Sequence, residues 1–238
     1  MARKGENKTE KRLAASKVIP LHRKKCTWNV KAKPGPHKKR NSVAIGFVLR
    51  DLIGITKNLK ETKRVLNAGS VLVDGKVVKD YRLPVGLFDL VAIVPEEKTY
   101  RVSFSKKGKI VVLEEEKNKK EKICKVVGKS VISKGVVQLA TNDGRSFKEK
   151  GSKAAVGDSL LVEVPEQKIA KEIKLEQGKV ALVVDGTHIG EVAKIKEITP
   201  GTMTRPKLVL LEAGKTQFKT VESNIVAVGD SKPVIRVE

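Results

Sequence analysis

The chain has 238 residues, enough for two or three small domains, and its 50 Lys and Arg against 27 Asp and Glu leave a formal net charge of +23. So large a positive excess favours a polyanionic partner such as a nucleic acid and argues against a neutral or acidic one. Aromatic residues make up only 3% of the chain, which disfavours modules that hold bases mainly by stacking, so phosphate and shape contacts are expected.

The cysteines and the hydropathy pattern exclude other classes of protein. Cys26 and Cys124 are far apart in the sequence, and neither has a second Cys or a His at metal-ligand spacing, so we expect no disulfide framework and no zinc site. No window approaches the roughly 20 apolar residues of a membrane helix. The sequence therefore predicts a cytoplasmic protein with no cofactor, no membrane association and no small-molecule substrate.

Residues 1–41 form a basic arm with fourteen Lys and Arg and two acidic residues. Apolar residues are too sparse for a core of its own, and Pro20, Pro34 and Pro36 interrupt any long helix. A solubilising tail is one interpretation. We favour an arm that orders along RNA, with the only Trp, Trp28, against the first domain or a base. The expected RNA contacts of the arm are Arg12, Arg23, Lys24, Lys25, Trp28, Lys31, Lys33, His37, Lys38, Lys39 and Arg40.

The next segment, residues 42–95, reads as two short helices followed by a β-hairpin. Apolar residues between Val48 and Ile53 recur at helical spacing and predict the first helix. Asn58, with Glu61 three residues later, is a capping-box signal that opens the second helix. The sequence SVLVDGKVVK that follows has two alternating apolar runs about an Asp-Gly pair, which predicts a tight hairpin.

The predicted second helix has an apolar face and a cationic face. At about 100° per residue, Leu59, Thr62, Val65 and Leu66 fall on one side of the helix, and the basic residues fall on the other. A solvated face is the simplest interpretation of such a charge run, whereas the adjoining basic hairpin favours an RNA-binding surface. The expected RNA contacts of this segment are Arg50, Lys57, Lys60, Lys63, Arg64, Lys76, Lys79 and Arg82.

The order of these elements resembles a known RNA-binding module. LKETKRVLNAGSVLVDGKVV, followed by VGLFDLVAI, is similar to the module shared by ribosomal protein four, several pseudouridine synthases and bacterial tyrosyl-tRNA synthetases. The resemblance implies that the second helix and the hairpin present a concave basic surface to folded RNA. The segments KRLAA, KPGPH, LRDL and KDYRLPVGLFD resemble, in this order, the archaeal and eukaryotic e-type family of small-subunit ribosomal protein four, over nearly the full length of the chain.

The remainder of the chain, residues 96–173 and 174–238, reads as two β units. Short apolar runs separated by turn residues predict a barrel-like central unit, in which the charged run at 114–122 is interpreted as a solvated loop. QGKVALVVDGTHIGEVAKIKEI resembles a KOW motif, for which we expect RNA contacts from Lys179, His188 and Lys194. A local bond within its turn is the simpler interpretation of His188. The last residues, from Gly229, read as a tail.

The predicted fold is therefore α+β and multidomain, with a basic arm (1–41), a helix-helix-hairpin RNA-binding module (42–95), a β-barrel-like central unit (96–173) and a KOW-type C-terminal unit (174–238). No active-site motif is present, so no enzyme is expected. The expected function is structural, in the cytoplasmic small ribosomal subunit, with small-subunit ribosomal RNA and neighbouring ribosomal proteins as partners. Two alternatives stay open: a factor that joins ribosomes transiently, and an RNA-modifying enzyme that carries the same module.

Overall fold

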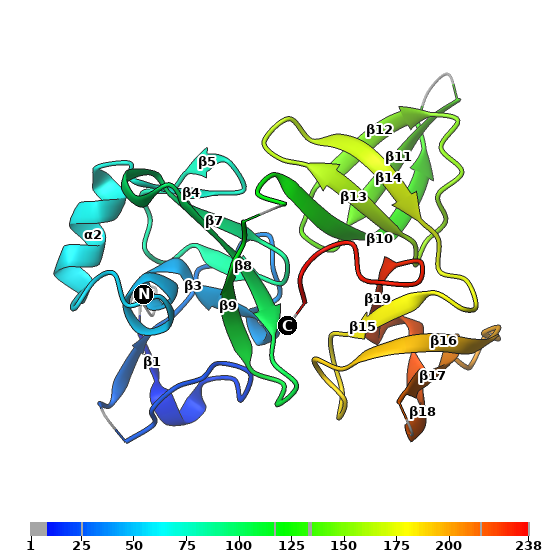
Figure 1. Ribbon diagram of the computed structural model, residues 1–238, viewed down its shortest axis with the longest axis horizontal. Helices are drawn as coiled ribbons and strands as arrows, with labels where there is room; N and C mark the ends of the chain where they lie inside the picture. Colours follow the sequence, from blue (N-terminus) through cyan, green and yellow to red (C-terminus); the bar gives the residue numbers. More distant parts are fainter. Residues whose placement is uncertain (1–8, 25, 117, 133–134, 215, 238) are drawn as a thin grey trace, which may run out of the picture.

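The structure is a computed structural model that describes residues 9–24, 26–116, 118–132, 135–214 and 216–237. Within these residues the chain has few helices and many antiparallel strands, which form three five-stranded sheets and two two-stranded ribbons (Figure 1). The predicted mixture of helix and sheet is confirmed at this level. We call the three large sheets the first, central and C-terminal sheets, in chain order.

The arm folds into a small ribbon that leads into the helices. Its strands β1 (Thr9–Lys11) and β2 (Trp28–Val30) pair antiparallel, and 3₁₀ turns occupy Arg12–Ala14 and Lys39–Asn41. Strand β3 (Ser42–Ala44) then pairs with β6 (Pro84–Gly86). Val18 from the arm belongs to the same buried apolar cluster as the first sheet. The arm therefore packs on the first part of the protein itself, which gives it a surface on which to order.

Two short helical segments follow β3. The first consists of α1 (Ile45–Phe47) and a π-helical turn (Val48–Leu52), so it begins three residues before the predicted apolar run. The second, α2 (Leu59–Asn67), begins where the sequence predicts it: Asn58 Oδ1 accepts a hydrogen bond from the Glu61 N–H at 2.9 Å. In a standard capping box the Glu61 carboxylate would accept a hydrogen bond from the N–H of the cap residue, Asn58. Here it accepts instead from the N–H of Lys57, one residue earlier.

The first sheet contains strands from two predicted domains. Its order is β5 (Lys76–Val77), β4 (Val71–Val73), β7 (Leu90–Ile93), β8 (Lys98–Phe104) and β9 (Ile110–Glu114). A 3₁₀ turn at Val94–Glu96 joins β7 to β8, which pair as neighbours. The expected division between residues 95 and 96 is thus corrected, because β8 and β9 complete this sheet instead of starting the central one.

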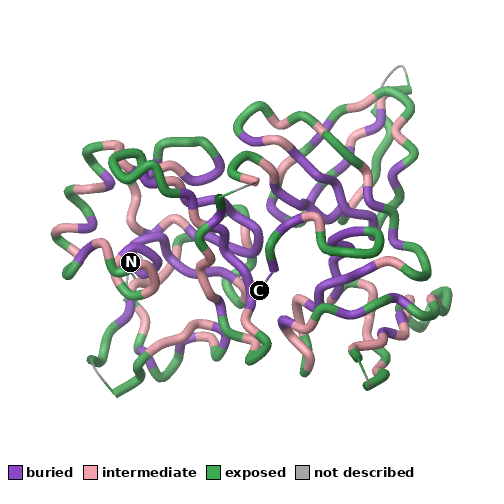
Figure 2. Tube along the Cα trace, viewed as in Figure 1, coloured by how far each residue is buried: buried purple, intermediate pink, exposed green. Residues whose placement is uncertain are grey.

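The central and C-terminal sheets are each formed by five strands that follow one another in the sequence. All their pairings are antiparallel, but the order in each sheet differs from the order in the chain. The central order is β12 (Ser146–Lys150), β11 (Val136–Thr141), β10 (Glu121–Val131), β13 (Ser159–Glu163) and β14 (Lys168–Ile173). The C-terminal order is β18 (Thr216–Val221), β17 (Leu208–Ala213), β16 (Val192–Thr199), β15 (Val180–Val183) and β19 (Ile225–Gly229), with a 3₁₀ turn at Glu222–Asn224. Buried residues line the strands of all three sheets (Figure 2).

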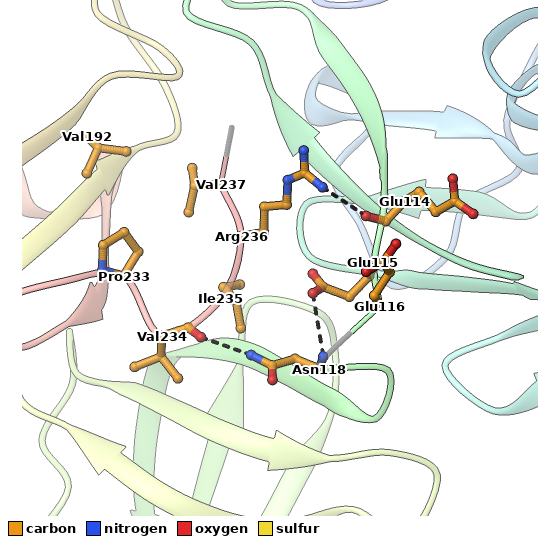
Figure 3. A pocket seen from close by; sticks show the side chains of 10 residues that line it. All are labelled: Glu114, Glu115, Glu116, Asn118, Val192, Pro233, Val234, Ile235, Arg236 and Val237. Carbon is orange, nitrogen blue, oxygen red and sulfur yellow. Dashed lines mark hydrogen bonds between the residues drawn. The ribbon is translucent and has the colours of Figure 1, made fainter.

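The last described residues form a strap between the first and C-terminal sheets. Ile235 and Val237 are buried in the cluster that both sheets share. Ser103 Oγ donates to the Val237 carbonyl at 3.0 Å, and Asn118 Nδ2 donates to the Val234 carbonyl at 3.0 Å. Figure 3 shows Arg236 beside them, with its guanidinium donating to the Glu114 carbonyl at 3.2 Å. The expectation of a tail after Gly229 is wrong, because these apolar side chains have a core to enter.

A close backbone approach joins the C-terminal sheet to the β8–β9 turn. Gly190 has φ +87°, and a Cβ on it would lie 2.1 Å from the Ser105 carbonyl oxygen. Gly178 has a similar φ of +84°, with nothing within 4 Å of such a Cβ. The two positions share the conformational requirement for glycine and differ in the available space.

Gly190→Ala is therefore expected to destabilise the protein more than Gly178→Ala. Both substitutions incur the strain of a positive φ, about 1 kcal/mol, and only the first also forces two backbones apart, for about 1 to 3 kcal/mol more. Chemical denaturation of the two variants measures the difference. Equal losses in the free energy of unfolding would show that the contact at Ser105 is not tight.

Candidate nucleic-acid interface

Helix α2 separates a buried stripe from a cationic face. Thr62 and Leu66 are fully buried, and Leu59 and Val65 are partly buried, as the sequence predicts. Opposite them lie four exposed cations; these are Lys57, Lys60, Lys63 and Arg64. In the described part of the chain none of the four has an ion-pair partner, so their charges face outward uncompensated. Such a face is suited to binding phosphates.

The cationic face of α2 continues towards the hairpin and the loop after it. Lys63 Nζ lies 4.6 Å from the centre of the Tyr81 ring, a cation–π contact that places this lysine over the loop. Asp74 and Gly75 both have positive φ, of 49° and 76°, as the predicted two-residue hairpin turn requires. Lys76 and Lys79 are exposed on and after β5. Six exposed cations thus come from one helix and its neighbouring hairpin.

Three of the expected contacts are instead bonded within the protein; Arg12 and Arg82 are buried and His37 is partly buried. Arg12 donates to the carbonyls of His22 at 2.9 Å and Trp28 at 3.3 Å. Arg82 donates to the Lys31 carbonyl at 3.4 Å. His37 Nε2 lies 2.7 Å from Asp89 Oδ2. Arg82 and His37 connect the arm to the rest of the protein, and Arg12 holds the arm together internally. We correct the assignment of Arg12 and Arg82 as RNA contacts, because burial keeps them from a phosphate, and His37 is a weaker candidate because Asp89 already occupies it.

A second group of expected contacts is occupied by acidic partners. The pairs are Arg50 with Asp51, Lys33 with Asp80, Lys39 with Glu10, Arg40 with Asp185, Lys179 with Glu176 and Asp230, and His188 with Glu191. His188 also stacks on Phe218, with ring centroids 3.9 Å apart, so it is locally bonded. An exposed ion pair is worth little in free energy and can open for a phosphate, but these residues are weaker candidates than unpaired cations.

The remaining expected contacts are without such partners. Lys31 is partly exposed, and the fully exposed members are Arg23, Lys24, Trp28, Lys38 and Lys194. No ion pair involves these cations within the described ranges. Lys25 lies outside the described residues.

A buried ionic cluster joins the first sheet to the central sheet, and sequence reasoning missed it. Lys122 Nζ lies 2.8 Å from Asp74 Oδ2, 2.5 Å from Asp89 Oδ1 and 3.0 Å from Asp143 Oδ2. Arg145 completes it, at 2.5 Å from Asp74 and 3.0 Å from Asp143. The interpretation of 114–122 as a solvated loop is therefore wrong at its end, because Lys122 is almost wholly buried.

The electrostatics of this cluster hold its members in their charged forms. Burial raises the pKa of both Asp89 and Asp143, but Lys122 outweighs that effect together with His37 at Asp89 and with Thr141 and Arg145 at Asp143. The pKa of Asp89 therefore lies well below its usual range, and that of Asp143 is about 2. Burial lowers the pKa of Lys122, and the carboxylates around it raise that pKa well above its usual value. Local sequence gave no sign of this, because the partners of Lys122 come from three separate turns.

The described residues contain neither a metal-binding cluster nor a membrane-spanning helix. No cluster of three or more His, Cys, Asp or Glu side chains there could hold a metal ion. None of the helices there is long and apolar enough to span a membrane.

The chain is similar to known proteins over its whole length. The model of "Ribosomal family S4e" matches residues 86–169, and the RS4NT domain model matches residues 4–40. The small ribosomal subunit protein eS4 of Methanosphaera stadtmanae is 40% identical over 99% of this chain and 98% of its own. That of Methanocaldococcus jannaschii is 38% identical over the full length of both. The crystal structure of the 30S ribosomal protein S4e from Thermoplasma acidophilum has a TM-score of 0.69 at 30% identity, covering 80% of this chain and 96% of that one.

Proposed function

The chain belongs to the S4e family of ribosomal proteins, and from this membership we propose that it is a structural constituent of the small ribosomal subunit that binds small-subunit ribosomal RNA. Its relatives carry the name of a ribosomal protein and not that of an enzyme, so the alternative of an RNA-modifying enzyme is set aside. In this proposal the protein lies in the cytoplasm and contacts ribosomal RNA and neighbouring small-subunit proteins.

One observation carries the proposal of RNA binding: the uncompensated cationic face of α2 and the hairpin. A helix that merely solvates its outer side has no need to leave Lys60, Lys63 and Arg64 without acidic partners, since like charges three and four residues apart destabilise a helix. Phosphates of folded RNA would offset that repulsion. Lys76 and Lys79 extend the same surface, which is the part of the predicted RNA-binding module that we retain.

Two further parts of the chain support this proposal. The exposed, unpaired cations of the arm would add contacts beside α2, and Lys194 would add one from the C-terminal sheet, in the KOW-type unit that the sequence suggests. Several weak attachments bind RNA strongly together, because each bound site raises the effective concentration of the others. The first and central sheets would keep these sites at fixed spacing.

The triple substitution Lys60→Gln, Lys63→Gln and Arg64→Gln is expected to weaken binding to small-subunit ribosomal RNA by at least about tenfold. Glutamine keeps the helix propensity and the buried stripe, so the fold should survive. The slope of log K against log salt should also become shallower by about 2, as about three phosphate contacts are lost. A filter-binding titration across salt concentrations measures both quantities.

The matched control removes three exposed charges elsewhere, by glutamine at Lys148, Lys150 and Lys153 near the edge of the central sheet. This variant should keep nearly all of the affinity. Equal losses in the two triple variants would mean that net charge alone drives binding and would contradict the assignment of the α2 face. In a separate experiment, subunits that carry the protein are washed at high salt: a structural constituent is retained, and a transient factor leaves.

A further inference from the structure

Trp28 stands on the outer face of the ribbon formed by β1 and β2. Neighbouring residues of a strand point to opposite sides, and here Asn29 is 5% exposed whereas Trp28 is 54% exposed. Lys11 is the register partner of Trp28, so its side chain shares this outer face. The largest aromatic side chain of the protein is thus uncovered and lies beside a cation.

The backbone beneath Trp28 is held firmly. The Arg12 N–H donates to the Thr27 carbonyl at 2.9 Å, and Arg12 Nε donates to the Trp28 carbonyl at 3.3 Å. Arg12 is itself 3% exposed and also donates to the His22 carbonyl at 2.9 Å. A side chain on so well-bonded a strand loses little backbone freedom when it meets a ligand, which favours binding.

The surroundings of Trp28 are cationic. The Arg12 guanidinium donates to the carbonyls of both His22 and Trp28. Arg23 and Lys24 belong to the loop between these two residues. Both are exposed, as is Lys11, and among the described residues none of these three cations has an ion-pair partner. A ligand that covers Trp28 must therefore be a flat or apolar group that carries negative charge nearby.

We propose that Trp28 stacks on an unpaired base of RNA, with Lys11, Arg23 and Lys24 neutralising the phosphates on either side of that base. Aromatic side chains flanked by cations are the general means by which proteins bind single-stranded nucleic acid. A duplex keeps its bases stacked inside, so the target is a loop, bulge or end. Figure 1 shows β1 on the same side of the molecule as α2, remote from the C-terminal sheet, so one RNA could reach both. The inference rests on the proposed RNA binding and adds a base contact to it.

The fluorescence of the protein offers a direct test, because Trp28 is the only tryptophan. The full-length protein is titrated with a single-stranded oligoribonucleotide of about six nucleotides, and separately with an abasic oligomer of the same length and charge, at about 0.15 M salt. A dye on each oligomer reports occupancy through its anisotropy. At equal occupancy the base-bearing oligomer is expected to quench Trp28 emission, and the abasic oligomer is expected to leave it unchanged.

Substitutions of Trp28 test whether the contact that quenches its emission also contributes to affinity. Trp28→Ala should weaken binding of the base-bearing oligomer about tenfold and leave that of the abasic oligomer unchanged, since a stacked base contributes a few kcal/mol at most. Trp28→Phe should keep most of the affinity. The matched control is Leu13→Ala, which removes another exposed apolar side chain of the arm, at 75% exposure, and should change neither affinity.

Three outcomes would overturn the inference. Emission that is unchanged at saturating RNA, or a Trp28→Ala variant that binds both oligomers as the unsubstituted protein does, would show that no base covers this ring. Emission that responds to an isolated small-subunit protein but not to RNA would assign the surface to a protein neighbour. In each case binding of ribosomal RNA by the α2 face would still stand; only a protein without affinity for ribosomal RNA would remove the proposed function as well.

Discussion

Replacing Lys122 with Met is expected to lower the free energy of unfolding by about 3 to 5 kcal/mol, because it leaves buried carboxylates without their central cation. Methionine fills a similar volume, so the loss reports on charge and not on a cavity. Asp89 suffers most, since its remaining side-chain partner is His37, whereas Asp74 and Asp143 both retain Arg145. Denaturant titration followed by circular dichroism measures the loss.

The control for this substitution lies three residues away. Lys119→Met removes the same charge from an exposed position and should change stability by less than about 0.5 kcal/mol. If the two variants were equally stable, the buried cluster would contribute nothing, and the contact between the first and central sheets would have to depend on apolar packing alone.

Acid pH provides a second measure of the same cluster. The folded pKa of Asp143, about 2, lies below its usual value of 3.8, so its charge adds stability that is present above pH 4 and is lost as the pH falls towards 2. Asp89 is shifted in the same direction. The stability difference between the unsubstituted protein and Lys122→Met should therefore be largest near neutral pH and shrink below pH 4. A constant difference would contradict the charged state of the cluster.

Removing residues 1–41 is expected to abolish cooperative folding of the first sheet. Val18 would leave the main core, and the His37 side chain would leave Asp89. The backbone bond from the Lys33 N–H to the Arg82 carbonyl would also be lost, with the whole of β1 and β2. These losses together approach the 5 to 15 kcal/mol by which an ordinary domain is stable. Soluble yield and the thermal unfolding curve measure the effect.

The control is the double substitution Arg23→Gln and Lys24→Gln, at two exposed cations of the arm that have no ion-pair partner among the described residues. It keeps Val18 in the core and the pair of His37 with Asp89, so it should leave the unfolding temperature nearly unchanged. A stable, soluble protein without residues 1–41 would show that the arm contributes little to the core and would favour an arm that orders mainly along RNA.

Features that depend on near neighbours in the chain could be predicted from the sequence. The cap at Asn58, the hairpin turn at Asp74 and Gly75, and the buried and cationic faces of α2 all follow from residues within a few positions of one another. Their physical causes are helical periodicity, local hydrogen bonds and positive φ, which act within single turns of the chain. The strongest candidate surface therefore follows from local sequence alone.

Which cations face outward could not be predicted in this way, because it depends on how distant segments pack together. Arg12, His37 and Arg82 look like their exposed neighbours in the sequence, yet each is bonded to a carbonyl or carboxylate from elsewhere in the chain, and the two arginines are buried. Lys122 is the clearest case, since its carboxylate partners Asp74 and Asp89 lie 48 and 33 residues away. A charged side chain has no periodicity that reveals its burial. Its position depends on whether distant segments bring an opposite charge close enough to offset the loss of hydration, and that is settled only when the sheets pack together.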